Sequence, residues 1–204
     1  MPTEDRRLWL IDAGYLFNAQ RSLGNRFLFD YLKLRTKVET FGPLWRAYYL
    51  NSVPQPPTEK QNAFHAFLQS GPPRGPKIIT KLYGLKNTTV DRAYCEECGS
   101  KVKLVCPHDP GHRLSNQEQK GVDVGIATLA LTHRDHYDTL VLSSGDADLL
   151  DAIEYLTEVG KRFELVVFKE NVSPDMQARA DAIHWIDDFA ADVRRDKYFY
   201  DDGE

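Results

Sequence analysis

The sequence is poor in cysteine, and it has neither a long apolar run nor an apolar segment at its start. Its 204 residues include only three cysteines, all between positions 95 and 106, which excludes a disulfide framework through the chain. No stretch approaches the roughly 20 apolar residues that cross a bilayer. Asp12 interrupts the first apolar run, which begins at Leu8, so no signal peptide is predicted. We therefore expect a cytoplasmic protein.

The composition is that of an ordinary globular domain, with an uneven distribution of charge. Hydrophobic residues make up 42% and charged residues 27% of the chain, which excludes a disordered or fibrous protein. The length fits one domain, or one domain with a small inserted module. The net charge is −4, but positions 74–120 carry nine Lys and Arg against five acids, whereas 135–204 carry seven against eighteen. The basic middle permits a polyanionic partner, although an ordinary solvated surface would look the same.

Short apolar runs alternate with helical patterns along most of the chain. Thr58 is the predicted N-cap of the third helix, and the Pro/Gly cluster at 71–76 is expected to end that helix. Near-continuous apolar strands that alternate with helices predict an α/β fold, with a mainly parallel sheet flanked by helices on both faces. The predicted strands are 8–11, 46–50, 78–80, 139–142, 163–168 and 182–186, and the predicted helices are 15–19, 31–41, 58–68, 116–132, 147–159 and 174–180.

Acidic residues follow two of the predicted strands directly. Asp12 ends the first strand, and Asp146 and Asp148 follow the strand at 139–142. Because ligands bind at the carboxyl ends of strands in an open parallel sheet, these carboxylates are expected to share one edge. Gly14 and Gly145 suit tight turns there. The alternative is that the acids only cap turns.

A fourth acid, Asp123, lies early in the helix predicted at 116–132, where it shares a face with Ala127 and Ala130. Such a position is unusual for an acid unless it faces a polar cavity, although the helix dipole also favours acids in a first turn. Carboxylates gathered in one cleft repel one another unless a cation neutralises them. A cluster of oxygen ligands favours Mg²⁺ or Mn²⁺, which commonly promote phosphodiester hydrolysis.

Three sequence blocks resemble the NYN domain family of the PIN-like nuclease superfamily. They are Ile11-Asp-Ala-Gly-Tyr-Leu16, Lys120-Gly-Val-Asp-Val-Gly-Ile-Ala127 and Leu142-Ser-Ser-Gly-Asp-Ala-Asp-Leu-Leu150, in the family order. Ser173, Ala180-Asp181 and His184-Trp-Ile186 resemble the closing segment of the family. The resemblance implies a Rossmann-like PIN fold over residues 1–195, followed by an acidic tail at 196–204. It also implies a metal-dependent ribonuclease in which Asp12, Asp123 and Asp146 bind Mg²⁺ or Mn²⁺ and Asp148 assists catalysis.

One position departs from the family pattern. Many relatives have Asn three residues after the first Asp, whereas this chain has Tyr15. Three functions therefore remain open: an endoribonuclease, a catalytically silent nucleic-acid-binding or regulatory module, and a deoxyribonuclease. RNA is the expected partner, with single-stranded DNA as the alternative, and a homo-oligomer or a protein partner is left open. The residues expected to bind the phosphate backbone are Lys120, Arg92, Lys101 and Lys103.

All three cysteines lie in one segment with two histidines. Cys95 and Cys98 form a Cys-x-x-Cys-Gly knuckle, and Cys106 follows after a predicted strand at 101–105. Three thiolates and one imidazole satisfy tetrahedral Zn²⁺. The fourth ligand is His112, or alternatively His108, and residues 86–115 are expected to form a small zinc-ribbon insertion around a structural ion. A redox Cys-x-x-Cys pair and unliganded buried thiols are the alternatives.

Weaker signals receive structural interpretations. His133 and His136 flank the end of a predicted helix and are expected to act as caps or surface residues. Tyr48 and Tyr49 are expected in the core or on a strand surface. The aromatic residues at 198–200 fit either a docking tail or a frayed end.

Overall fold

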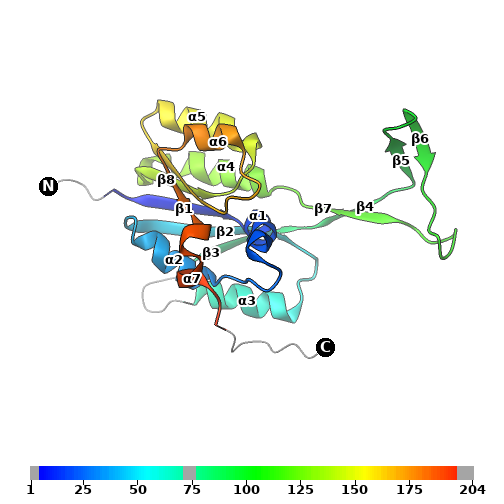
Figure 1. Cartoon of the computed structure of the whole chain (residues 1–204), viewed down its shortest axis with the longest axis horizontal. Coiled ribbons are helices and arrows are strands. Elements are labelled where there is room, and N and C mark those ends of the chain that lie inside the picture. Colours follow the sequence, from blue (N-terminus) through cyan, green and yellow to red (C-terminus); the bar gives the residue numbers. More distant parts are fainter. Residues whose placement is uncertain (1–4, 71–76, 197–204) are drawn as a thin grey trace.

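The computed structural model describes residues 5–70 and 77–196, which form an α/β body and a projecting arm (Figure 1). The body contains a six-stranded sheet with the order β10-β9-β8-β1-β2-β3, in which all neighbouring strands are parallel. The predicted α/β class with a mainly parallel sheet is confirmed. The strands are β1 (Arg7–Asp12), β2 (Leu44–Val53), β3 (Ile79–Gly84), β8 (Thr139–Ser143), β9 (Arg162–Val167) and β10 (Ala182–Trp185).

The direction in which strands are added to the sheet reverses between β1 and β8. The chain adds β2 and β3 on one side of β1, and it later adds β8, β9 and β10 on the other side. In open parallel sheets, ligands bind at the carboxyl ends of the strands that flank such a reversal, because the loops from those strands diverge there. A site is therefore expected where β1 and β8 end.

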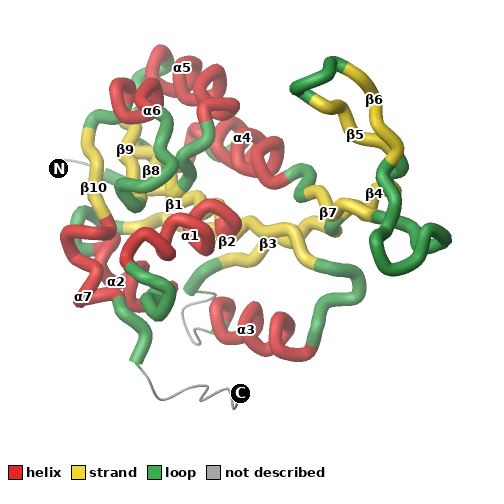
Figure 2. Tube along the Cα trace, turned by 45° about the vertical axis from the view of Figure 1, so that its right-hand side comes forward, coloured by secondary structure: helices red, strands yellow, loops and turns green. Residues whose placement is uncertain are grey.

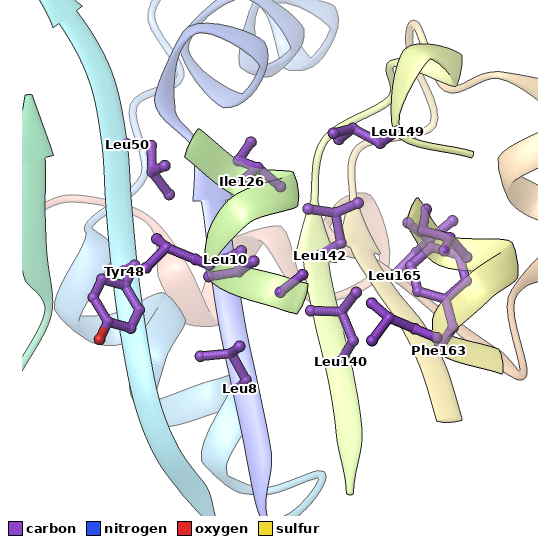
Figure 3. Packing of buried hydrophobic residues seen from close by; sticks show 14 of the residues in the cluster. Leu8, Leu10, Tyr48, Leu50, Ile126, Leu140, Leu142, Leu149, Phe163 and Leu165 are labelled. Carbon is purple, nitrogen blue, oxygen red and sulfur yellow. The ribbon is translucent and has the colours of Figure 1, made fainter. Parts of the chain in front are cut away.

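One face of the sheet is covered by α4 (Val122–Thr132), α5 (Leu150–Glu158) and α6 (Pro174–Arg179). Successive side chains of a strand point to opposite faces, and the residues on this face are apolar. Leu8 and Leu10 of β1 lie beside Leu140 and Leu142 of β8, and Ile126 of α4 packs over them (Figure 3). Each fully buried leucine contributes about 1.5–3 kcal/mol to stability.

The opposite face is covered by α1 (Ala13–Ala19), α2 (Tyr31–Glu39), α3 (Glu59–Gln69) and α7 (Ala190–Val193). Its core contains the alternate residues of the same strands, among them Trp9 and Ile11 of β1 and Val141 of β8. The indole N–H of the fully buried Trp9 donates to the Ser143 hydroxyl at 3.0 Å. The central strands are therefore buried on both faces, as their continuous apolar runs predict.

The arm leaves the body after β3 (Figures 1 and 2). An antiparallel pair, β4 (Lys86–Thr89) and β7 (Ser115–Glu118), leads away from the sheet. Beyond this pair, β5 (Arg92–Cys95) and β6 (Ser100–Lys103) form a second antiparallel pair, which we call the tip hairpin. Every side chain of the tip hairpin is at least partly exposed. Because a two-stranded hairpin is marginally stable alone, the tip hairpin requires a further source of stability.

The helix predicted at 116–132 is wrong over its first residues. Residues 115–118 form β7, which pairs with β4 from Thr89 opposite Ser115 to Lys86 opposite Glu118. Gly121 then adopts a left-handed φ of 87° as the N-cap of α4, which begins at Val122. The polar segment before Gly121 therefore gives its backbone hydrogen bonds to a ladder with β4 and not to a helical turn.

Several local predictions are confirmed. Thr58 caps α3 through a capping box with Gln61, and His133 is the C-cap of α4. Tyr48 and Tyr49 are buried in the two cores. The cluster at 71–76 and the aromatic residues at 198–200 lie outside the described residues. Within the described ranges, every helix is too short or too polar to span a membrane.

Candidate functional site

Asp12 lies where β1 ends and α1 begins. It is the N-cap of α1, and its Oδ1 accepts a hydrogen bond from the Tyr15 N–H at 3.0 Å. Its Oδ2 accepts a hydrogen bond from the Ser144 hydroxyl at 3.3 Å, from the chain that leaves β8. The residue is only 8% exposed. A carboxylate oxygen has two acceptor positions, so both oxygens keep capacity for a further ligand.

Asp146 and Asp148 lie in the turn that follows β8. The Asp146 N–H donates to the Ser144 hydroxyl at 3.3 Å, and the Asp148 N–H donates to Asp146 Oδ1 at 2.9 Å. The second bond makes Asp146 the N-cap of a short 3-10 helix, so the turn-capping role considered from the sequence is present. The Ser144 hydroxyl thus links Asp12 to the backbone of Asp146. This serine is a site residue that sequence reasoning missed, although its place after an apolar strand was a usable signal.

Asp123 reaches this edge of the sheet from the start of α4, the helix that follows the arm. It is the second residue of α4, and it is partly buried. The unpaired N–H groups of the first helical turn favour a negative charge at this position. Of the two alanines expected on its face, Ala130 is buried and Ala127 is partly buried against the core.

Neighbouring carboxylates raise the pKa values of two of the four acids. Burial raises the pKa of Asp12, and the charge of Asp123 raises it further, against the hydrogen bonds from Tyr15 and Ser144. Burial also raises the pKa of Asp123, and the charges of Asp146 and Asp148 add to this effect. Like charges that share a site resist ionising together. The fold therefore brings the four predicted acids to one edge of the sheet, where a bound cation would relieve their repulsion.

The donor set suits a hard divalent cation, but the side chains do not enclose one. Four carboxylates offer only oxygen ligands, which Mg²⁺ and Mn²⁺ prefer. Among the side chains that the structure describes, no three from His, Cys, Asp or Glu are grouped closely enough to hold a metal ion. Asp146 and Asp148 are exposed. A metal ion at this edge would therefore need the carboxylates to approach one another more closely than they do in the structure.

Tyr15, the departure from the family pattern, has a structural role beside the acids. Its hydroxyl lies 3.0 Å from the carbonyl oxygen of Phe168 and 3.1 Å from that of Glu170, and it donates to this pair. Burial raises the pKa of Tyr15, and the nearby charges of Asp187 and Asp12 raise it further, so the phenol stays protonated. The side chain thereby ties α1 to the loop that follows β9.

Gly14 and Gly145 both allow a close approach of neighbouring groups. The prediction of a tight turn is wrong for Gly14, which lies in α1, whereas Gly145 lies in the segment that follows β8. Gly14 is helical, and a Cβ added there would lie 2.9 Å from Gln119 Oε1 and 3.4 Å from Asp12 Oδ1. A Cβ at Gly145 would lie 2.0 Å from the carbonyl oxygen of Asn171. The side chain of Gln119 therefore lies beside Asp12, and sequence reasoning missed this residue because it precedes the family block.

The basic residues predicted to bind a phosphate backbone fall into two places. Lys120 is exposed and immediately precedes the Gly121 N-cap of α4, on the body. Arg92, Lys101 and Lys103 all lie on the tip hairpin. The structure therefore separates three of these four residues from the carboxylates.

Cys95 and Cys98 form one half of the predicted zinc site. Hydrogen bonds from the backbone and side chain of Cys98 and from the backbone N–H of Glu97 lower the pKa of the Cys95 thiol. Gly99 adopts a left-handed φ of 64°, and its N–H donates to the Cys95 carbonyl at 2.9 Å. This conformation turns two thiols to one side and favours the thiolate that a metal requires.

Cys106 and His112 form the other half. His112 Nδ1 lies 3.6 Å from Cys106 Sγ, and His112 Nε2 lies 3.4 Å from Asp109 Oδ2. Sulfur and nitrogen ligands of a tetrahedral zinc, at about 2.3 and 2.05 Å from the metal, are about 3.6 Å apart. The Asp109 carboxylate is the kind of partner that orients a ligating imidazole. This geometry favours His112 over His108, but in the described residues the two halves are not joined into one group.

Comparison with known proteins gives a family and a fold. The family model of the NYN domain matches residues 8–187. No curated protein matches the chain significantly. A solved structure of a protein of unknown function from Vibrio parahaemolyticus is 19% identical, with a TM-score of 0.65 over 96% of this chain and 99% of that chain. At this identity the likeness concerns the fold alone. Because the matched residues run from β1 to the end of β10 and include all four acids, the chain belongs to the NYN domain family, which has a PIN-like nuclease-type fold.

Proposed function

We propose that this protein is a metal-dependent endoribonuclease that hydrolyses RNA phosphodiesters at the carboxyl ends of β1 and β8. The observation that carries the proposal is the unfavourable charge of two buried acids. Burial raises the pKa of Asp12 and of Asp123, and a neighbouring carboxylate adds to each shift, from Asp123 in the first case and from Asp146 in the second. A protein maintains such repulsion at a cost to its stability, and a divalent cation removes that cost. Membership of a family whose domains are generally nucleases supports the same function.

Each residue would have a separate role at this site. Asp12, Asp123 and Asp146 would hold Mg²⁺ or Mn²⁺, with Asp148 beside them. When bound, such an ion polarises a phosphodiester and activates water for in-line attack. The Ser144 hydroxyl donates a hydrogen bond to Asp12 Oδ2, so this carboxylate is already oriented in the absence of the ion. Lys120, close in sequence to Asp123, would bind a phosphate of the RNA.

We propose in addition that the tip holds a structural Zn²⁺ through Cys95, Cys98, Cys106 and His112. The 3.6 Å separation of Cys106 Sγ and His112 Nδ1, which matches one edge of a tetrahedral zinc site, supports this assignment. Such a site has all four ligands from the protein, and the free energy of zinc binding would stabilise the folded hairpin. Protein purified without chelator should contain about one zinc per chain by elemental analysis. A zinc content near zero would contradict the assignment.

The nuclease function is tested by cleavage of end-labelled RNA with added Mg²⁺ or Mn²⁺. Asp12→Asn keeps the N-cap and removes the charge, so it should lower the cleavage rate by several orders of magnitude. Asp135→Asn is the matched control, because Asp135 is exposed and precedes β8 at the opposite edge of the sheet. Equal cleavage by wild type and Asp12→Asn, or no cleavage of RNA by wild type with either metal, would overturn the proposal.

A catalytically silent nucleic-acid-binding module is the second candidate. Two observations favour it: Tyr15 replaces the family Asn with a residue tied to the β9 loop, and the described acids do not form a ready three-ligand group. This alternative predicts RNA binding without cleavage in wild type and in Asp12→Asn alike. Cleavage of DNA and not RNA in the same assay would identify a deoxyribonuclease.

A further inference from the structure

The tip hairpin has one face that is both basic and aromatic. In its register, Arg92 lies opposite Lys103 and Tyr94 lies opposite Lys101. Directly opposite residues share a face of an antiparallel pair, and so do residues two apart on one strand. These four side chains therefore point to the same side. All four are exposed, whereas Ala93 and Cys95 on the other side are partly buried.

The cations of this face have no counter-ion in the part of the chain that the structure describes. Among the described residues, no carboxylate forms an ion pair with Arg92, Lys101 or Lys103. Like charges placed directly opposite, such as Arg92 and Lys103, destabilise a strand pair. The hairpin thus bears an unfavourable arrangement that a bound polyanion would neutralise.

Tyr94 gives this face a second property. Its side chain is 64% exposed, although an aromatic ring usually buries most of its surface. The hydroxyl lies beside the knuckle, 3.5 Å from where a Cβ on Gly99 would be. Exposed aromatic rings among cations are how proteins bind single-stranded nucleic acids, because each unpaired base offers a face for stacking. The bases of a duplex are already stacked on each other.

We propose that the tip hairpin binds an unpaired segment of the RNA substrate, with a base stacked on Tyr94 and phosphates contacting Arg92, Lys101 and Lys103. This inference rests on the proposed function, which supplies RNA as the ligand. Arg92 lies eight positions after Gly84, the last residue of β3. At about 3.3 Å per extended residue, this separation carries the hairpin up to about 26 Å from the sheet. The enzyme would therefore hold its substrate at a single-stranded segment remote from the bond it cleaves.

The test measures RNA affinity separately from cleavage, by fluorescence anisotropy of a labelled single-stranded RNA of roughly 20 nucleotides. All variants carry Asp12→Asn, so the probe stays intact. Tyr94→Ala should weaken binding about 5- to 100-fold, whereas Tyr94→Phe keeps the ring and should bind within about twofold of its parent. Lys101→Gln with Lys103→Gln should reduce the slope of log affinity against log salt by about 1.4, or 0.7 for each phosphate contact.

A matched control changes two other exposed cations, Arg46→Gln and Arg134→Gln, which lie at the opposite edge of the sheet. This pair should leave both affinity and salt slope unchanged. Zinc content and far-ultraviolet circular dichroism establish that each tip variant is folded. If Tyr94→Ala fails that check, the double lysine variant decides, because those exposed side chains have no partner among the described residues.

Three results would overturn the inference. The first is parent-like binding by Tyr94→Ala and by the double lysine variant, and the second is an equal loss in Tyr94→Phe and Tyr94→Ala. The third is a tip variant whose sedimentation coefficient differs from that of its parent while its RNA affinity is unchanged. That result would make the face an interface between copies of the chain. Loss of binding in Tyr94→Ala supports the inference even if wild type cleaves nothing, in which case only the nuclease proposal fails.

Discussion

Asp12 serves the fold and the candidate site at once. Its Oδ1 caps α1 through the Tyr15 N–H, and its Oδ2 bonds the Ser144 hydroxyl beside β8. A neutral asparagine could make the first contact equally well. Asparagine lacks only the negative charge. In Asp12 this charge is buried, and the nearby charge of Asp123 disfavours it by raising the pKa. The proposed cationic ligand would account for the aspartate, whereas the cap alone does not require it.

The charge of Asp12 should lower stability at neutral pH in the absence of metal. The folded pKa values of Asp12 and Asp123 are raised above the usual 3.8, so the folded state binds more protons than the unfolded chain above that pH. Their contribution to stability is thus favourable at low pH and is lost as the pH rises through the folded pKa values. Asp12→Asn should raise the melting temperature at pH 7 without metal, by about 2–4 °C per kcal/mol of repulsion removed. The same variant should flatten the dependence of unfolding free energy on pH above about 4.

Asp135→Asn is the control for both measurements, because its exposed side chain takes no part in the cluster. A lower melting temperature for Asp12→Asn, with no change for Asp135→Asn, would show that Asp12 is not under repulsion.

At the scale of elements, the loops that follow β8 and β9 are hydrogen-bonded to each other beside the acids. The Ser173 N–H donates to the Gly145 carbonyl at 3.0 Å, and Asn171 adopts a left-handed φ of 56°. Tyr15 holds the same loop from α1, through its contacts with the Phe168 and Glu170 carbonyls. The position of Asp146 therefore depends on contacts among three separate segments.

Gly145→Ala should disturb this arrangement. The added Cβ would lie 2.0 Å from the Asn171 carbonyl oxygen and 3.0 Å from the Tyr15 ring, and backbone cannot move aside cheaply. We expect a loss of roughly 1–3 kcal/mol in unfolding free energy, measured by urea denaturation. Gly111→Ala is the comparison, since its nearest neighbour is the flexible side chain of Asp109 at 3.2 Å. Equal effects of the two substitutions would contradict this explanation of Gly145.

Most elements of the body could be predicted from the sequence because the apolar runs of their strands, although short, are nearly continuous. Asp12 and Asp146 could be placed at one edge from the rule that parallel strands end together. The boundary of α4 could not be predicted, because β7 is a polar ladder with β4 and has no apolar period. The basic face of the tip hairpin also required the structure: only the register shows that Tyr94 lies opposite Lys101. Ser144 and Gln119 were missed because their roles depend on contacts across the site.

At the scale of the whole molecule, the body and the arm depend on different sources of stability. The body has two apolar cores, one on each face of its sheet. The arm consists of two-stranded pairs with largely exposed side chains, which apolar burial alone does not stabilise. A metal in the tip would therefore determine the stability of the arm and contribute little to the stability of the body.

Removal of zinc should loosen the arm long before the body unfolds. Hydrogen exchange in the presence of a strong chelator should become fast at residues 92–103 and stay slow in β1 and β8. Cys98→Ser should have the same effect without chelator, and a Ser100→Ala control, on β6 but outside the ligand set, should not. Slow exchange throughout the tip after chelation would show that the hairpin is stable without metal.

The central claim is that Asp12, Asp123 and Asp146 form a divalent metal site, and calorimetric titration with Mn²⁺ tests it most directly. The protein is first loaded with zinc, so that the tip does not compete for the added ion. We predict saturable binding by wild type at pH 7, at least about tenfold weaker binding by Asp12→Asn and Asp123→Asn, and wild-type affinity in Asp135→Asn. Absence of binding by wild type, or equal affinity in wild type and Asp12→Asn, would contradict the account.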